Sequence, residues 1–154
     1  MALARIGLGS NLGDSQATLE RAVAALAGLG EVTARSSFYR SAPWGVTDQP
    51  PFVNAAVLLE TALGPHELLA ELKRLEAELG RTETFRWGPR VVDLDILAYG
   101  DLRLADPDLV IPHARLFERA FALAPLAEID PDYREALERL PAGARAEVTR
   151  LPGG

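Results

Sequence analysis

The chain has 154 residues, 48% of them hydrophobic and 25% charged, with a net charge of −6 and no cysteine. This length suits one domain with a buried core, and the lack of cysteine excludes disulfides and thiolate metal sites. The acidic balance argues against a general nucleic-acid binder. No apolar run approaches the ~18 residues of a membrane span, and the start lacks a signal-peptide pattern. We therefore predict a cytoplasmic protein with no membrane or nucleic-acid partner.

The first part of the chain alternates strand and helix patterns. In order, these patterns predict a strand at 3–8 ending in a tight glycine turn, a helix from Asp14 or Ser15 to about Gly28, a strand at 32–39, a loop at 42–51 and a strand at 52–60. Asp14 and Ser15 are residue types that commonly cap a helix, and the glycines near 28–30 suit its end.

The second part begins with a strongly amphipathic helix between Gly64 and Gly80. Its expected buried stripe consists of Leu68, Leu72, Leu75 and Leu79. After it come a polar loop at 81–90, a strand at 91–97, a hairpin turn at Gly100 into 102–104, and helices at about 114–124 and 132–140. This order predicts an α+β sandwich of ferredoxin-like type, with a mostly antiparallel sheet covered by helices.

Asp93 and Asp95 carry the clearest chemical signal. Residues two apart on a strand point to the same side, so both carboxylates should share one face while Leu94 and Ile96 enter the core. Hard oxygen donors at this spacing suit Mg²⁺, especially with substrate phosphates completing its coordination. The alternative is a solvent-exposed strand face that happens to be acidic.

Three arginines, Arg81, Arg86 and Arg90, lie within ten residues just before this strand. Guanidinium groups bind phosphate oxygens in a bidentate manner, so the loop can form a triphosphate clamp. Alternatively, the arginines are exposed and pair with the same aspartates. The chain has no P-loop, and its GLGSNLG segment does not fit the dinucleotide-binding spacing.

A few aromatic residues suggest a pocket for a flat heterocycle. Phe52 shares a strand face with Asn54, whose amide can bind the edge of a ring that stacks on the phenyl group. Trp44 and Trp87 lie in polar loops and can act as lids. Core packing is the alternative for Phe52 and Phe121. Of the two histidines, His66 is expected at the surface and His113 as a second phosphate contact, with a structural role as the default for both.

The run FRWGPRVVDLDI at 85–96 resembles the signature of the 6-hydroxymethyl-7,8-dihydropterin pyrophosphokinase family of folate biosynthesis. Other matching segments are GSNL at 9–12, SFYR at 37–40, DQP at 48–50, NAAV at 54–57 and IPH at 111–113. The resemblance spans nearly the whole chain. It implies a single pterin pyrophosphokinase domain over 1–154, folded as a three-layer α/β/α monomer. It also implies transfer of pyrophosphate from ATP to the pterin hydroxymethyl group with two Mg²⁺ ions, releasing AMP.

The resemblance further implies a role for each matching residue. Asp93 and Asp95 would hold both magnesium ions, while Arg81 and Arg90 would complete the catalytic set by neutralising the transferring group. The ATP site would comprise Lys73, Glu76, Arg81, Arg86, Arg90, Ile96, His113 and Arg119. The pterin site would comprise Ser41, Ala42, Trp44, Phe52, Asn54, Trp87, Asp93 and Phe121.

Two other classes of protein remain as alternatives. A ferredoxin-like fold can be an RNA-binding module that stacks bases on sheet aromatics, although the acidic pI and the paired aspartates oppose this. A regulatory nucleotide-binding domain without catalysis is the second alternative. Loss of Arg81, Arg90 or either aspartate would indicate it, and all four residues are present.

Overall fold

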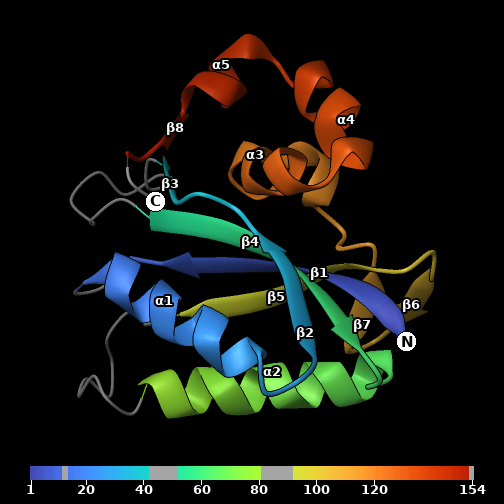
Figure 1. Cartoon of the computed structure of the whole chain (residues 1–154). Helices are drawn as coiled ribbons and strands as arrows, with labels where there is room; N and C mark the ends of the chain where they lie inside the picture. The colour runs from blue at the N-terminus through green and yellow to red at the C-terminus, as the bar shows by residue number, and fades with distance from the viewer. Residues whose placement is uncertain (12–13, 42–51, 81–91, 153–154) are drawn as a thin grey trace.

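The computed structural model of the chain describes residues 1–11, 14–41, 52–80 and 92–152. One large sheet lies between two groups of helices, giving three layers (Figure 1). The strands are β1 (Ala2–Ser10), β2 (Glu31–Arg35), β3 (Tyr39–Ser41), β4 (Phe52–Thr61), β5 (Asp93–Tyr99), β6 (Leu104–Asp106), β7 (Leu109–Ile111) and β8 (Val148–Arg150). The helices are α1 (Ser15–Leu26), α2 (Pro65–Gly80), α3 (Ala120–Ile129), α4 (Arg134–Arg139) and α5 (Ala142–Ala146), with 3₁₀ turns η1 (Leu116–Glu118) and η2 (Pro131–Tyr133).

The large sheet has the order β5-β1-β4-β3-β8, and β2 also pairs with β4. Every strand pair in the described chain is antiparallel. The predicted α+β, ferredoxin-like class with a mostly antiparallel sheet is therefore confirmed. No helix in the described ranges is long and apolar enough to cross a membrane.

Helices α1 and α2 cover one face of the sheet (Figure 1). The Asp14 side chain accepts a hydrogen bond from the Ala17 N–H at 3.1 Å, which confirms it as the cap of α1. The predicted leucine stripe of α2 is buried as expected. It packs with apolar side chains of β1, β4 and β5, among them Ile6, Val57 and Ile96. These contacts form the larger part of the core and hold β5 against α2.

Helix α3 covers the opposite face, where Ala56 and Leu97 pack against Leu123 and Leu126. The helix predicted at about 114–124 is wrong in its boundaries, because α3 begins at Ala120 after the short turn η1. Arg119 between them is extended, with φ −113° and ψ 105°, which interrupts the helical run.

The predicted hairpin after β5 is also wrong. Strand β6 pairs with β7 in a separate two-stranded sheet, not with β5. Gly100 has φ +52°, and its N–H donates to the Leu3 carbonyl at 2.8 Å. This long-range bond docks the turn on β1, so the chain leaves the large sheet there.

The strand predicted at 32–39 is divided into β2 and β3. Between the pairs Arg35–Val57 and Tyr39–Asn54, this edge advances four residues while β4 advances three. Ser36 occupies the irregular step, and its hydroxyl accepts from the Ala56 N–H at 2.9 Å. A buried serine thus replaces a main-chain acceptor at the bulge.

Two carboxylates, those of the buried Asp130 and the half-buried Glu128, tie α3 and the following turn to the sheet. Asp130 pairs with Arg5 of β1 at 2.8 Å and accepts from the Asp132 N–H. Glu128 accepts from the Ser37 N–H and from the Tyr39 hydroxyl, the latter at 2.7 Å. Burial, with the bond to Glu128 second, raises the pKa of Tyr39, so its hydroxyl stays protonated and can donate.

Candidate active site

A cavity of about 580 Å³ lies between the large sheet and the α3 layer. Its floor comes from β1, β4 and β5, and its other walls from the segment 113–122 and from the C-terminal segment 144–148. Eight of the predicted site residues line it: Ser41, Phe52, Asn54, Asp93, Asp95, His113, Arg119 and Phe121. The cavity therefore gathers residues from positions far apart in the sequence.

The two aspartates of β5 share the cavity side of the sheet, as their spacing predicted. Asp93 lies opposite Gly9 of β1, and Asp95 lies opposite Gly7. Because glycine has no side chain, neither position places a Cβ on the cavity floor beside the carboxylates. A Cβ added at Gly7 would lie 3.1 Å from the Leu97 side chain. This open acidic floor offers hard oxygen donors, which fit Mg²⁺ better than a softer metal ion.

Three residues expected near a nucleotide do not line the cavity. Lys73 is exposed on α2, which covers the other face of the sheet. Glu76 accepts a hydrogen bond from the Leu94 N–H at 2.8 Å, so it braces β5 between the two aspartates. The Ile96 side chain is in the core, and only its main chain could reach a ligand on the cavity side. Their contact with a nucleotide stays a prediction.

His113 and Arg119 supply donors on the wall of the cavity above β5. The His113 N–H donates to the Leu97 carbonyl at 2.9 Å, which fixes the residue beside the acidic strand. Its Nδ1 accepts from the Arg115 N–H at 3.3 Å, so a neutral ring carries its proton on Nε2. The Arg119 guanidinium lies 5.4 Å from the centre of the Phe121 ring, a cation–π contact. Both residues can donate to a phosphate group.

The other end of the cavity combines aromatic rings with a fixed amide. Phe52 enters from the sheet and Phe121 from the helix layer. The Asn54 Nδ2 donates to the Ser41 hydroxyl at 2.8 Å, and both residues are buried. A Cβ at Gly9 would lie 3.2 Å from the Asn54 Oδ1. The glycine thus leaves room for the Asn54 amide, which can form hydrogen bonds with the polar edge of a flat ring.

The remaining predicted residues lie outside the residues that the structure describes; they are Ala42, Trp44, Arg81, Arg86, Arg90 and Trp87.

Sequence reasoning missed several residues that line the cavity, chiefly Gly7, Gly9, Arg115, Glu118, Ala144, Glu147 and Val148. Gly9 was assigned to a tight turn after the strand predicted at 3–8, but β1 continues through it to Ser10. Two glycines that are two residues apart in a strand lie on the same face of the sheet, so they could have predicted a part of that face without side chains.

Paired carboxylates, a histidine and an arginine around one cavity are residue types that enzymes of phosphoryl transfer use to bind a divalent metal ion and phosphate groups. The comparison with known families agrees, since the family 7,8-dihydro-6-hydroxymethylpterin-pyrophosphokinase (HPPK) matches residues 5–131. The chain belongs to this HPPK family. The two aspartates, His113, Arg119 and both pocket phenylalanines fall within the matched residues.

Several bacterial relatives are similar to the chain over most of their own length. In longer bifunctional folate-synthesis proteins from Pisum sativum and Arabidopsis thaliana, the match spans only about a quarter of the relative. Among the bacterial relatives, one from Methylorubrum extorquens, a 2-amino-4-hydroxy-6-hydroxymethyldihydropteridine pyrophosphokinase, is 51% identical over 91% of this chain and 94% of its own. Pyrophosphokinases of the same name from Bacillus subtilis and Pseudomonas aeruginosa are 48% and 43% identical, over 82% and 96% of this chain and 77% and 96% of their own. These relatives indicate a diphosphotransferase of folate synthesis.

Solved structures show the same fold in longer chains. Plasmodium falciparum HPPK-DHPS, in a complex with SDX-DHP, aligns with a TM-score of 0.68 at 15% identity, over 90% of this chain and 43% of that chain. A complex of that protein with pterin and p-hydroxybenzoate gives 0.72 at 16% identity, over 97% and 46%. The chain thus spans less than half the length of these structures, which support the fold alone.

Proposed function

We propose that the chain transfers pyrophosphate from ATP to the hydroxymethyl oxygen of 6-hydroxymethyl-7,8-dihydropterin, a step of tetrahydrofolate biosynthesis. The main observation behind this proposal is the composition of one cavity. Asp93 and Asp95 lie at one end of it, and the hydrogen-bonded Asn54 amide lies with two phenylalanines at the other. Such a cavity suits a triphosphate next to a flat heterocycle. Membership of the HPPK family supports the particular substrates.

In the proposed reaction, the pterin hydroxymethyl oxygen forms a bond to the β-phosphorus of ATP. The bond from this phosphorus to the oxygen that bridges it to the α-phosphorus breaks, the hydroxyl proton is lost, and AMP leaves. Asn54 would bind the pterin edge between Phe52 and Phe121, which orients the hydroxymethyl group toward β5. His113, through its Nε2 proton, and Arg119 would bind the triphosphate. Positioning of the substrates and neutralisation of charge account for most of the catalysis of such a transfer.

The cavity floor fits the two Mg²⁺ ions that the proposal requires. Asp93 and Asp95 would hold both, and the ions would neutralise charge that develops on the phosphate oxygens. Arg81 and Arg90 would neutralise the transferring group, and Arg86 would assist from the same loop. Ser41, Ala42, Trp44 and Trp87 would complete the pterin site, while Lys73, Glu76 and Ile96 would lie near the nucleotide.

The proposal includes a monomeric, cytoplasmic enzyme with one domain over residues 1–154. The RNA-binding alternative predicts an open sheet face that displays aromatic side chains. In the described part of the chain, helices cover both faces of the large sheet (Figure 1). Phe52 lines the cavity between the sheet and the α3 layer. A base-stacking platform is therefore not favoured.

The product of ATP turnover tests the proposal directly. With ATP, Mg²⁺ and the hydroxymethyl dihydropterin, we expect AMP and pterin diphosphate in equal amounts, measured by ion-exchange chromatography. An ordinary kinase would release ADP, because attack would then occur at the γ-phosphorus. ADP as the stoichiometric product would contradict the proposed reaction, and the absence of turnover would favour a regulatory nucleotide-binding domain.

Gly9→Ala is expected to weaken pterin binding about tenfold, since the new Cβ would displace the Asn54 amide by a few tenths of an ångström. Equilibrium binding of the pterin should show this loss, with ATP affinity changed less than about twofold. Gly143→Ala is the matched control, because an added Cβ there meets nothing within 4 Å. Equal pterin affinity in both variants would show that the Asn54 position does not limit binding.

A further inference from the structure

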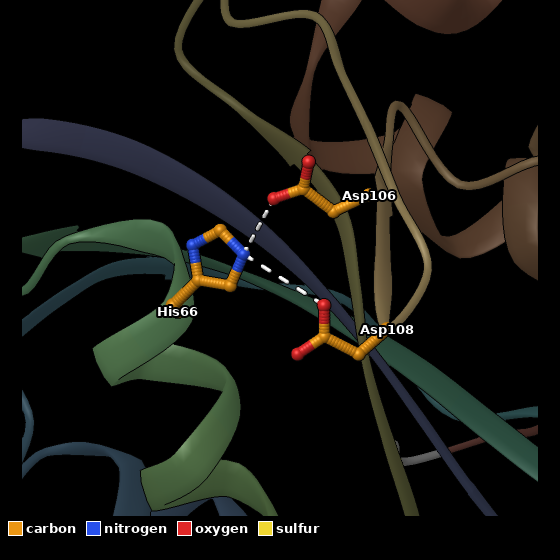
Figure 2. Close-up of side chains that lie close together, drawn as sticks. All are labelled: His66, Asp106 and Asp108. Carbon is orange, nitrogen blue, oxygen red and sulfur yellow. Dashed lines mark ion pairs between the residues drawn. The ribbon is translucent and has the colours of Figure 1, made fainter.

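A histidine and two aspartates converge outside the cavity. His66 lies in the first turn of α2, while Asp106 ends β6 and Asp108 lies in the turn before β7 (Figure 2). The His66 Nε2 is 2.9 Å from Asp106 Oδ2 and 3.9 Å from Asp108 Oδ1. One donor atom from each residue lies within 4.8 Å of the others. None of the three residues lines the cavity.

The donor set is chemically mixed, which distinguishes it from an ordinary acidic surface patch. An imidazole nitrogen with two carboxylate oxygens suits zinc and similar divalent ions, whereas Mg²⁺ prefers oxygen ligands alone. With bonds of about 2.1 Å, two ligands of one tetrahedral ion lie about 3.4 Å apart. The two distances from Nε2, 2.9 and 3.9 Å, lie on either side of this value.

Regular backbone structure holds His66 and Asp106 in place, whereas all three side chains are largely exposed. The first turn of α2 is closed by the bond from the Leu68 N–H to the Gly64 carbonyl at 2.8 Å. Asp106 pairs with Leu109 across the β6–β7 hairpin. The side chains are 42–70% exposed, so small rotations can bring them to one ion and water can complete its coordination.

The charges also favour a cation. Two aspartates face one imidazole, so with a neutral ring the three side chains together carry a net charge of −2. We propose that His66, Asp106 and Asp108 bind a divalent transition metal ion of the zinc type. The bound ion would connect the first turn of α2 to the β6–β7 hairpin, and the site is independent of the proposed catalytic reaction.

Zinc titration of the metal-depleted protein, followed by NMR of the imidazole groups, tests this site. The chain has two histidines, so comparison with His66→Gln assigns both rings. ZnCl₂, added without ATP, should shift the His66 ring signals until they saturate, while MgCl₂ should not move them. Zinc bound only by Asp93 and Asp95 would leave the His66 signals unchanged, which would contradict the proposal.

Three aspartate variants separate a chelating site from a single imidazole that binds zinc alone. Asp106→Asn and Asp108→Asn should each weaken zinc binding at His66 on the order of tenfold, since each removes a charged ligand. Asp101→Asn makes the same charge change at an exposed residue outside the cluster and should leave the affinity within about twofold. Equal affinity in all three variants would overturn the proposed three-residue site.

Thermal unfolding gives a second, independent measurement. Because the ion binds the folded protein, zinc at about a hundredfold excess over its Kd should raise the Tm by about 5–11 °C. The rise should be absent in His66→Gln. An equal rise in that variant would assign the stabilisation to zinc bound elsewhere, and would contradict the proposed connection between α2 and the hairpin.

Discussion

Replacement of Asp95 by asparagine is expected to lower turnover on the order of 10³-fold. The substitution keeps the shape of the side chain and removes one of two carboxylates on the open floor beside Gly7 and Gly9. The remaining carboxylate of Asp93 would hold the metal ions weakly, so saturating Mg²⁺ should not restore the rate. The measurement is AMP formation across a range of Mg²⁺ concentrations.

The fold of this variant should be retained, because Asp95 is exposed and has a like charge two residues away. Its Tm should equal or slightly exceed the wild-type value without metal. Asp101→Asn is the matched control, since it removes the same charge from an exposed turn outside the cavity. Turnover within about threefold of wild type in Asp95→Asn would mean that the aspartate pair is only a polar strand face.

A second large effect is expected from Asp130→Ala, which should destabilise the folded protein by about 3–5 kcal/mol. Arg5 and Asp130 form a buried pair, with side-chain exposures of 12% and 7%. Burial alone would lower the pKa of Arg5, but the bond to Asp130 and nearby negative groups raise it overall. Without Asp130, the guanidinium would remain charged and buried, and the Asp132 N–H would lose its acceptor.

Chemical denaturation at pH 7 measures this loss, and a Tm lower by about 10 °C should accompany it. Glu135→Ala is the control, because its ion pair with Arg139 is about 75% exposed and should change stability by less than about 0.5 kcal/mol. Similar stability for the two variants would show that Arg5 finds another partner or is hydrated when Asp130 is removed.

Local periodicity was sufficient to predict the parts of the fold in which one face of an element is buried. The spacing of Leu68, Leu72, Leu75 and Leu79 identified the buried face of α2, and the alternation around Asp93 placed both carboxylates on one side of β5. The cap at Asp14 is equally local, since its bond spans three residues. Each of these predictions needed only neighbours in sequence.

The direction of the turn at Gly100 and the partners of His66 were not predicted, because both depend on distant contacts. The turn at Gly100 resembled a hairpin, but its direction is set by a bond to Leu3, almost a hundred residues earlier. His66 was expected at the surface, and it is half exposed, yet its partners Asp106 and Asp108 lie forty residues later. No periodicity within α2 could have indicated them.

The C-terminal wall of the cavity is a similar case. Strand β8 pairs with β3, which places Val148 beside Ser41 and brings Ala144 and Glu147 to the cavity. The local sequence predicted a helix that ends near residue 140 and no strand after it. A three-residue strand at the edge of a sheet forms only by pairing with the folded sheet. The sequence of such a short segment therefore contains no periodic pattern that predicts a strand.

This wall has a consequence for selective inhibition. The aspartate pair and the ring pocket lie within residues 5–131, which match the family, whereas Ala144, Glu147 and Val148 lie beyond them. A compound that fills the pocket alone would contact the part of the cavity that the family match covers. A substituent extended toward Glu147 would instead contact a wall supplied by the C-terminal segment. Compounds elaborated in that direction offer a route to discriminate between this enzyme and relatives with a different C-terminal segment.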